Sequence, residues 1–312
     1  MPTWLGVVLA VALLAAPVLL DSYYLHALIT SMIFLLPAHG LNLIVGYTGM
    51  MSLAQGAFFG IGSYVSALLA MHLGTPFWVN FLAAGVVTGL IALPLGVPAL
   101  RLRTYSFVMC TLGLVVIGET VAKNWISVTR GDMGLSGIPR PHLGFGVEVT
   151  TITGYYYLFL FLAVVMTALF WALVSSPAGR AMIAIRDNET QAEALGIPTW
   201  SYKLIVFALS AAFAGFGGSM FAHYLTTISP LTFQMYYSTT ILIIVLGGGA
   251  GTIRGVVVGS LTFVAVSEAL RIAPELRMII YGFVLLLLVF WLPKGITPLV
   301  DKVFALARGR ST

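Results

Sequence analysis

The chain has 312 residues, of which 60% are hydrophobic and 8% are charged, with a formal net charge of +5 at neutral pH. A soluble domain carries about 25% charged residues, so the composition excludes a soluble globular protein and predicts an all-α protein that crosses a membrane many times. The positive charge does not imply a nucleic-acid partner, because Lys and Arg usually mark the cytoplasmic loops of membrane proteins.

About ten apolar runs along the chain are long enough, or nearly long enough, to cross a bilayer as helices. The first run lacks a basic start and continues into the next, so we interpret it as an uncleaved helix rather than a signal peptide. The expected spans lie at about Trp4–Leu20, Leu25–Val45, Leu53–Met71, Phe77–Leu100, Tyr105–Ala122, Gly154–Val174, Ser201–His223, Met235–Leu246, Val256–Leu270 and Met278–Leu292. Together they make the whole chain, 1–312, a single transmembrane domain.

Two long polar segments interrupt these spans, at 123–153 and at 175–199. If the N-terminus is inside, about two thirds of the 15 Lys and Arg residues lie on the inner side of the expected spans. This bias predicts that both ends of the chain and segment 175–199 are cytoplasmic, and that loop 123–153 lies on the outer side.

The segment Ser175–Thr199 reads SSPAGRAMIAIRDNETQAEALGIPT and carries the signals of short helices. Ser176 followed by Pro177 is typical of a helix start, and Gly196 followed by Pro198 is typical of a helix stop. A capping box before a second helix is offered by Asn188 with Gln191, or by Thr190 with Glu193. We therefore predict one or two short helices between two apolar spans.

The apolar runs contain few ionisable residues. Glu119 and Glu268 fall near expected outer ends, and Arg254 lies near the inner side. An ion-coupled carrier often needs a titratable or ion-binding cluster at mid-depth, so this pattern argues against a stand-alone secondary carrier. The chain also lacks the phosphate-binding pattern G-x-x-x-x-G-K-[ST]. Because no catalytic or metal-ligand spacing stands out and Cys110 is the single cysteine, we expect no enzyme activity, no metal and no cofactor.

One broken apolar stretch, Leu41–Tyr64, carries several neutral hydrogen-bonding residues. Free backbone groups at half-helix ends suit a zwitterionic solute, because helix N-termini favour carboxylates. An equally weighted alternative is that these polar groups satisfy one another at a kink. The candidates for a substrate path are Asn42, Tyr47, Thr48, Ser52 and Gln55, with Thr239 and Thr240 as weaker candidates.

Small residues recur at four-residue spacing in several spans, which lets helix backbones approach closely. The pairs are Gly56 with Gly60 and Gly85 with Gly89, and Gly251, Gly255 and Gly259 form a longer series. We interpret most of them as packing positions, with a sliding or gating role as the alternative. The run Gly247–Gly255 is expected to be irregular backbone partly buried at membrane depth, where it must be enclosed by protein or line a cavity.

The blocks LNLIVGYTG, SLAQGAFFGIGSY and GRAMIAIRDNETQAEALGI, followed by YKLIVFALSAAFAGFGGSMFAH and GGGAGTIRG, carry a family resemblance. The chain resembles the inner-membrane permeases of branched-chain amino-acid ABC importers, most closely their LivM-type subunits, over nearly its whole length. The resemblance implies a type II ABC importer fold of ten helices, like that of the cobalamin importers. It also implies a heterodimer with a second, homologous permease, two cytoplasmic ATPase subunits that use the ATP, and a periplasmic binding protein.

The same resemblance implies a role for segment 175–199 as a cytoplasmic coupling loop whose helix docks in a groove of the ATPase, and it places loop 123–153 in the periplasm. The sequence Glu193-Ala194 with Gly196 is similar to a shortened form of the E-A-A…G motif of such permeases, although Leu195 replaces its third small residue. Without the resemblance, a solvated hairpin is an equal alternative. The expected coupling residues are Gly179, Arg180, Ile185, Arg186, Asp187, Asn188, Glu193, Ala194, Leu195 and Gly196.

Two kinds of contact are expected within this coupling loop. Ile185 and Leu195 offer apolar anchors, and Arg180, Arg186 and Asp187 can set the register by charge. The motifs specify the solute poorly: leucine, isoleucine and valine are the leading expectation, and urea, amides or small organic acids are alternatives within the family. A secondary carrier and a non-transport membrane scaffold or enzyme remain the competing classes.

Overall fold

The computed structural model describes residues 13–17, 19–144, 148–269, 283 and 295. The expected first span, Trp4–Leu20, lies largely outside the described residues, and so does the last one, Met278–Leu292, of which only Phe283 is described. In the described part, six helices are long and apolar enough to cross a membrane. They are α2 (Ser22–Asn42, continued by the π-helix η1, Leu43–Tyr47), α3 (Gln55–Leu73), α4 (Phe77–Ala99), α5 (Thr104–Asn124), α7 (Ile152–Ser175) and α10 (Thr199–Leu225).

Two further apolar helices, α11 (Met235–Gly248) and α12 (Ile253–Ala269), are shorter than these six. With 14 residues, α11 is about 21 Å long, which is less than the roughly 30 Å of a bilayer's hydrocarbon core. The described residues therefore form a helical protein with six helices that can cross a membrane. Helices lie within a few residues of eight of the expected spans, although two of these helices are short.

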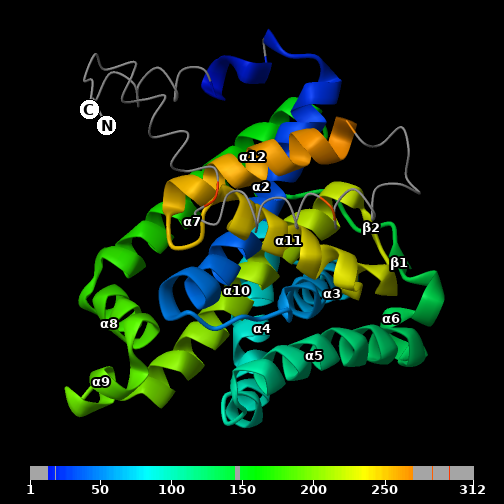
Figure 1. Ribbon diagram of the computed structural model, residues 1–312. Coiled ribbons are helices and arrows are strands. Elements are labelled where there is room, and N and C mark those ends of the chain that lie inside the picture. The colour runs from blue at the N-terminus through cyan, green and yellow to red at the C-terminus, as the bar shows by residue number, and fades with distance from the viewer. Residues whose placement is uncertain (1–12, 18, 145–147, 270–282, 284–294, 296–312) are drawn as a thin grey trace, which may run out of the picture.

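The helix α10 forms the centre of the bundle and packs against α4, α3 and α2 (Figure 1). The second half of α2 is buried from Ser31 to Asn42, whereas α5 and α7 turn much of their surface outward. On α4 the large side chains Leu82, Val86 and Leu90 are exposed at four-residue spacing. Such an apolar outer face suits lipid, while the small residues of the same helix face α10.

The expected series of small residues do pack helices together. A Cβ on Gly85 would lie 2.1 Å from the ring of Phe216, and one on Gly89 would lie 3.2 Å from the carbonyl oxygen of Ala208. Both contacts are with α10. In the later series, a Cβ on Gly259 would lie 2.3 Å from the carbonyl oxygen of Ile244, and one on Gly255 would lie 2.7 Å from that of Gly248, so α11 and α12 meet backbone to backbone. The packing interpretation is confirmed for these positions.

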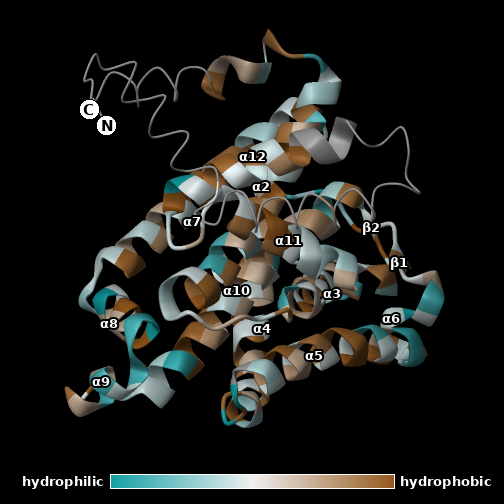
Figure 2. Cartoon of the chain, viewed as in Figure 1, coloured by the Kyte–Doolittle hydropathy of each residue, from teal (hydrophilic) through white to brown (hydrophobic). Residues whose placement is uncertain are grey.

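Two polar regions lie at opposite ends of the central helix. The short helices α8 (Pro177–Asp187) and α9 (Glu189–Ala194) come just before α10, and strand β2 (Thr227–Ile228) comes just after it. With 27 residues, α10 separates them by about 40 Å. Figure 1 shows α8 and α9 at one edge of the molecule and β1 and β2 at another, and Figure 2 shows hydrophilic residues on α8 and α9.

The polar loop 123–153 belongs to the β2 end of the molecule. It contains α6 (Ile126–Thr129), the 3₁₀ turn η2 (Gly131–Met133) and strand β1 (Leu135–Ser136). Strand β1 pairs antiparallel with β2, with Leu135 opposite Ile228, and a second 3₁₀ turn, η3 (Pro230–Phe233), follows β2. The two polar segments of the sequence therefore lie at opposite ends of the bundle, as expected for loops on opposite sides of a membrane.

Candidate functional site

The coupling segment forms two short helices, as its helix signals predict. Ser176 is the N-cap of α8 with Pro177 in its first turn, but the Ser176 hydroxyl donates to the carbonyl of Leu173 instead of capping. Asn188 caps α9, because its side-chain oxygen accepts from the backbone N–H of Gln191 at 3.1 Å. Its own backbone N–H donates to the carbonyl oxygen of Ala184, so only the N-cap half of the expected Asn188–Gln191 box is present. Gly196, with φ +83°, ends the segment.

The alternative capping box, Thr190 with Glu193, is wrong. The Glu193 carboxylate accepts instead from the hydroxyl of Thr199 at 2.6 Å, which fastens the end of α9 to the first residue of α10. At the other end of the segment, a Cβ on Gly179 would lie 2.0 Å from the carbonyl oxygen of Val174. Only glycine therefore allows α8 to turn this closely against the end of α7.

The segment has an inner and an outer face. Met182, Ile185 and Ala192 are buried within the chain. Ile185 is only 3% exposed, so its side chain packs within this chain, which argues against the expected role as an anchor for a partner. Leu195 is 81% exposed and remains available. The expected coupling residues that are also exposed are Arg180, Arg186, Asp187, Asn188, Glu193, Ala194 and Gly196.

Charged side chains attach the segment to the bundle. Lys203 of α10 forms an ion pair with Glu189 of α9. The Arg186 guanidinium donates from Nη1 to the carbonyl oxygen of Gly46 at 2.7 Å and from Nε to Asp187 at 3.2 Å. Arg186 therefore contacts the end of the first described span, in addition to lying on the exposed segment.

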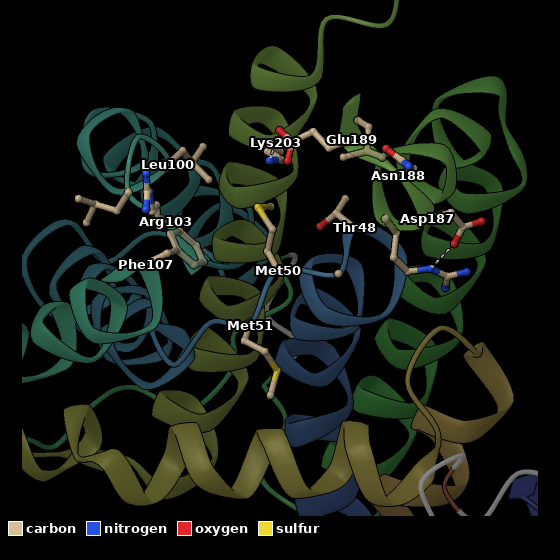
Figure 3. A pocket seen from close by; sticks show the side chains of 14 residues that line it. Thr48, Met50, Met51, Leu100, Arg103, Phe107, Asp187, Asn188, Glu189 and Lys203 are labelled. Carbon is tan, nitrogen blue, oxygen red and sulfur yellow. Dashed lines mark hydrogen bonds and ion pairs between the residues drawn. The ribbon is translucent and has the colours of Figure 1, made fainter. Parts of the chain in front are cut away.

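A cavity of about 400 Å³ opens between the coupling segment, the loop after η1, the α4–α5 turn and the start of α10. Figure 3 shows Leu100, Arg103 and Phe107 on one side and Asp187 and Asn188 on the other. Its charged lining residues are Arg103, Arg186, Lys203, Asp187 and Glu189, and Met50 and Met51 also line it. The cavity is thus lined by charges of both signs beside apolar surface, and four of the five charged side chains form the ion pairs Lys203–Glu189 and Arg186–Asp187.

The polar side chains of the broken stretch that begins at the end of α2 are hydrogen-bonded to backbone groups in several places. The Asn42 side chain accepts from the N–H of Gly251 at 2.7 Å and donates to the carbonyl of Thr252 at 3.4 Å. The Thr48 hydroxyl donates to Ile44 at 2.7 Å, and the Ser52 hydroxyl accepts from Ala54 at 3.3 Å. At these positions the polar side chains are satisfied by backbone groups, rather than by one another as the alternative interpretation expected.

Two candidates for the substrate path keep a free acceptor. Gln55 donates from Nε2 to the hydroxyl of Ser210 at 2.5 Å, while its buried Oε1 has no partner among the described residues. The buried Thr240 hydroxyl also has none there. Tyr47 packs edge-on against Phe170, and the Thr239 hydroxyl donates to the carbonyl oxygen of Met235 in its own helix. Of the substrate-path candidates, Thr48 alone lines the 400 Å³ cavity.

The first turn of α3 depends on residues that the sequence did not single out. The Ser238 hydroxyl of α11 accepts from the N–H of Gly56 at 2.8 Å and donates to the carbonyl of Leu53 at 2.6 Å. The N–H of Leu53 in turn donates to the hydroxyl of Thr111 on α5 at 3.0 Å. These groups would otherwise be unpaired at a helix start, so side chains from two other helices replace a local cap.

Replacing Ser238 with alanine is therefore expected to destabilise the start of α3. It leaves two backbone groups unpaired, at about 1–3 kcal/mol for each buried group. Hydrogen exchange of residues 53–58 in the purified chain measures the change. The matched control is Thr120→Ala, because the Thr120 hydroxyl only bonds the carbonyl of Val116 in its own helix. Equal exchange in both variants would contradict the role of Ser238.

Within the described residues, no group of three His, Cys, Asp or Glu side chains is placed to hold a metal ion. Sequence reasoning also missed Gly251 and Thr252 as partners of Asn42. The glycine-rich run in which Gly251 lies was the available signal, but nothing in it points to Asn42. Asn42 and Gly251 are far apart in the sequence and meet only through the packing of α2 against α11 and α12.

Comparison with known proteins gives consistent matches. A family model described as "Branched-chain amino acid transport system / permease component" matches residues 23–289. The permease protein LivM of the high-affinity branched-chain amino acid transport system is 34% identical in Salmonella typhimurium, over 90% of this chain and 71% of the relative. LivM of Escherichia coli K12 is 33% identical to this chain, over 89% of this chain and 71% of the relative. LivH, a second permease protein of the same system in Salmonella typhimurium, is 27% identical to this chain, over 86% of this chain and 93% of the relative. No solved structure matches the chain.

Proposed function

The chain belongs to the branched-chain amino acid transport permease family and is a permease subunit of an ABC importer, and from this premise we propose that it carries leucine, isoleucine, valine or a related amino acid into the cytoplasm. The observation that carries the proposal is the similarity to LivM, which extends over 90% of this chain. The chain itself supplies a transmembrane pathway, and ATP is hydrolysed by separate subunits.

The proposal extends to fold and assembly. The complete permease has about ten transmembrane helices in the type II importer arrangement and lies in a bacterial inner membrane with both ends in the cytoplasm. Its partner in the membrane is a second, homologous permease; similarity to both LivM and LivH, two permeases of one transport system, supports a heterodimer. Two cytoplasmic ATPase subunits and a periplasmic binding protein complete the importer.

Within this assembly, α8 and α9 form the coupling helices and dock on an ATPase subunit. Three features support this role: their exposed polar faces, the exposed Leu195, and their position at the opposite end of α10 from loop 123–153. The solute passes beside the interrupted stretch from Asn42 to Gln55. The unpartnered Oε1 of Gln55 supports that path, because a buried acceptor in a membrane protein is otherwise costly.

Reconstitution tests the proposed function directly. The chain is incorporated into vesicles with its genomic neighbours, namely the second permease, the ATPases and the binding protein, and uptake of labelled leucine is measured with and without ATP. We expect uptake only when ATP and the binding protein are both present. Competition by unlabelled isoleucine and valine, with urea, a short amide and a small organic acid as comparisons, identifies the solute class. Uptake driven by an ion gradient without ATP would contradict the proposal and indicate a secondary carrier.

A further inference from the structure

We propose that Arg186 is a positioning residue that links the coupling segment to the interrupted backbone inside the membrane bundle, and that it does not belong to the ATPase docking surface. Its guanidinium holds the end of the α2–η1 helix at Gly46, which in turn is joined to the α11–α12 connection at Gly251. The inference rests on the proposed function, because it requires α8 and α9 to be the elements on which the ATPase acts.

The first step is the direct contact between Arg186 and Gly46. Gly46 lies in the last turn of the helix formed by α2 and η1, where backbone carbonyls have no partner within the helix. The Arg186 Nη1 reaches its carbonyl oxygen at 2.7 Å. A cation at a helix C-terminus is favoured by the helix dipole, and a charged donor makes a hydrogen bond stronger than a neutral one does.

The second step is the path of the arginine side chain, which glycines keep open. A Cβ on Gly49 would lie 3.0 Å from the Arg186 Cγ, and one on Gly251 would lie 3.3 Å from its Nη1. Both glycines have positive φ, +72° and +80°, so any larger residue would also strain the backbone. The backbone on both sides of the guanidinium is therefore shaped to let it reach inward.

The third step joins the contacted helix end to the end of α11. The Asn42 side chain bonds to the N–H of Gly251 at 2.7 Å. A Cβ on Gly46 would lie 2.2 Å from the same nitrogen, so the two backbones are in direct contact. Arg186 thus meets a unit formed by two chain segments far apart in sequence. A displacement of α8 reaches both of them through one side chain.

The final step is that the link can be released. Arg186 borders the 400 Å³ cavity, which gives the side chain room to move. Asp187 already accepts from its Nε at 3.2 Å, as the dashed line in Figure 3 shows. The guanidinium therefore keeps a charged partner when it leaves Gly46. With Gly46 as its inner partner and Asp187 as its outer partner, Arg186 can transmit a movement of α8 in one state and release the end of the α2–η1 helix in another.

The test uses the complete importer in vesicles, with Arg186→Gln, Arg186→Lys and the matched control Arg101→Gln. Arg101 is exposed at the α4–α5 turn, and its side chain has no described partner. Three quantities are measured: co-purification of the ATPase, solute transported per ATP hydrolysed, and hydrogen exchange of residues 43–51. For Arg186→Gln we expect the ATPase to stay bound, transport per ATP to fall about tenfold, and residues 43–51 to exchange faster.

Arg186→Lys keeps a charged donor and is expected to retain more transport per ATP than Arg186→Gln, while Arg101→Gln leaves all three quantities unchanged. If Arg186→Gln does not accumulate in the membrane, the same three quantities measured on Arg186→Lys test the inference. Loss of the ATPase with unchanged exchange at 43–51 would place Arg186 on the docking surface and overturn the inference. Unchanged transport per ATP would overturn it as well. Failure of the proposed function is distinct, since the unmodified importer would then show no ATP-driven uptake.

Discussion

Replacing Gly62 with alanine is expected to destabilise the permease strongly, by an amount at the upper end of the roughly 1–3 kcal/mol typical of overpacked cores. A Cβ on Gly62 would lie 2.3 Å from the Cα and 2.5 Å from the carbonyl oxygen of Gly215. Both are backbone atoms, so no side chain can turn aside to make room. The helices α3 and α10 would have to separate along their whole crossing.

The consequences extend along that crossing. A Cβ on Gly218 would lie 2.2 Å from the carbonyl oxygen of Phe59, so Gly218 needs the same close approach. The hydroxyls of Ser66 and Ser219 bond at 2.8 Å across the two helices and would be pulled apart. In a bilayer, apolar contact with lipid replaces apolar contact with protein, so packing and such hydrogen bonds supply most of the helix association.

Gly113→Ala is the matched control for this prediction. Gly113 lies inside α5, and a Cβ there would meet nothing within 4 Å. Alanine has the higher helix propensity at both positions, by about 1 kcal/mol, so propensity alone predicts that both variants gain stability. Thermal unfolding of the purified chain in lipid discs separates the two effects. A Gly62→Ala variant as stable as Gly113→Ala would show that α3 and α10 do not cross at this distance.

The positions of the helices could largely be predicted from the sequence because apolar runs of span length leave little choice. The helices of the coupling segment were predictable for a different reason: Pro177, Asn188 and Gly196 act through local geometry that needs no tertiary contact. Gly62 shows where such reasoning stops. The four-residue glycine spacing pointed to Gly56 and Gly60, yet Gly56 faces Ser238 and Gly60 faces the ring of Phe233. Which glycine of α3 lies at the crossing with α10 depends on which face α3 turns to that helix, and the spacing of the glycines does not show this.

The candidate site was predictable in composition but not in its connections. Asn42 and Gln55 were recognised as unusual polar residues, and both are buried in the bundle. Their partners, Gly251 in the α11–α12 connection and Ser210 in α10, are far away in the sequence, so the sequence could not distinguish a solute path from a satisfied kink. The inward contacts of Ile185 and Arg186 were not predictable for a related reason. An apolar and a charged residue on a polar segment look exposed until the packing of α8 shows that both reach inward.

Replacing Leu195 with glutamate is expected to release the ATPase from the importer while the permease still folds. Leu195 is 81% exposed at the turn that follows α9, so its side chain contributes little to packing within the chain. An exposed leucine between polar residues suits an apolar pocket on a partner, and removal of such an anchor typically weakens binding by about 2 kcal/mol, or roughly thirtyfold. A buried carboxylate in that pocket adds a desolvation penalty. Titration of purified ATPase against the permease in lipid discs measures the change.

Met133→Glu is the matched control, because Met133 is 91% exposed and lies at the opposite end of the bundle, in loop 123–153. The control introduces the same charge at a similar exposure, so it should bind the ATPase as the unmodified chain does. Leu195→Ala removes the anchor without adding a charge and is expected to bind with intermediate affinity. Unchanged affinity in Leu195→Glu would remove α9 from the docking surface. Equal weakening in Met133→Glu would instead indicate that added negative charge, rather than a lost contact, lowers the affinity.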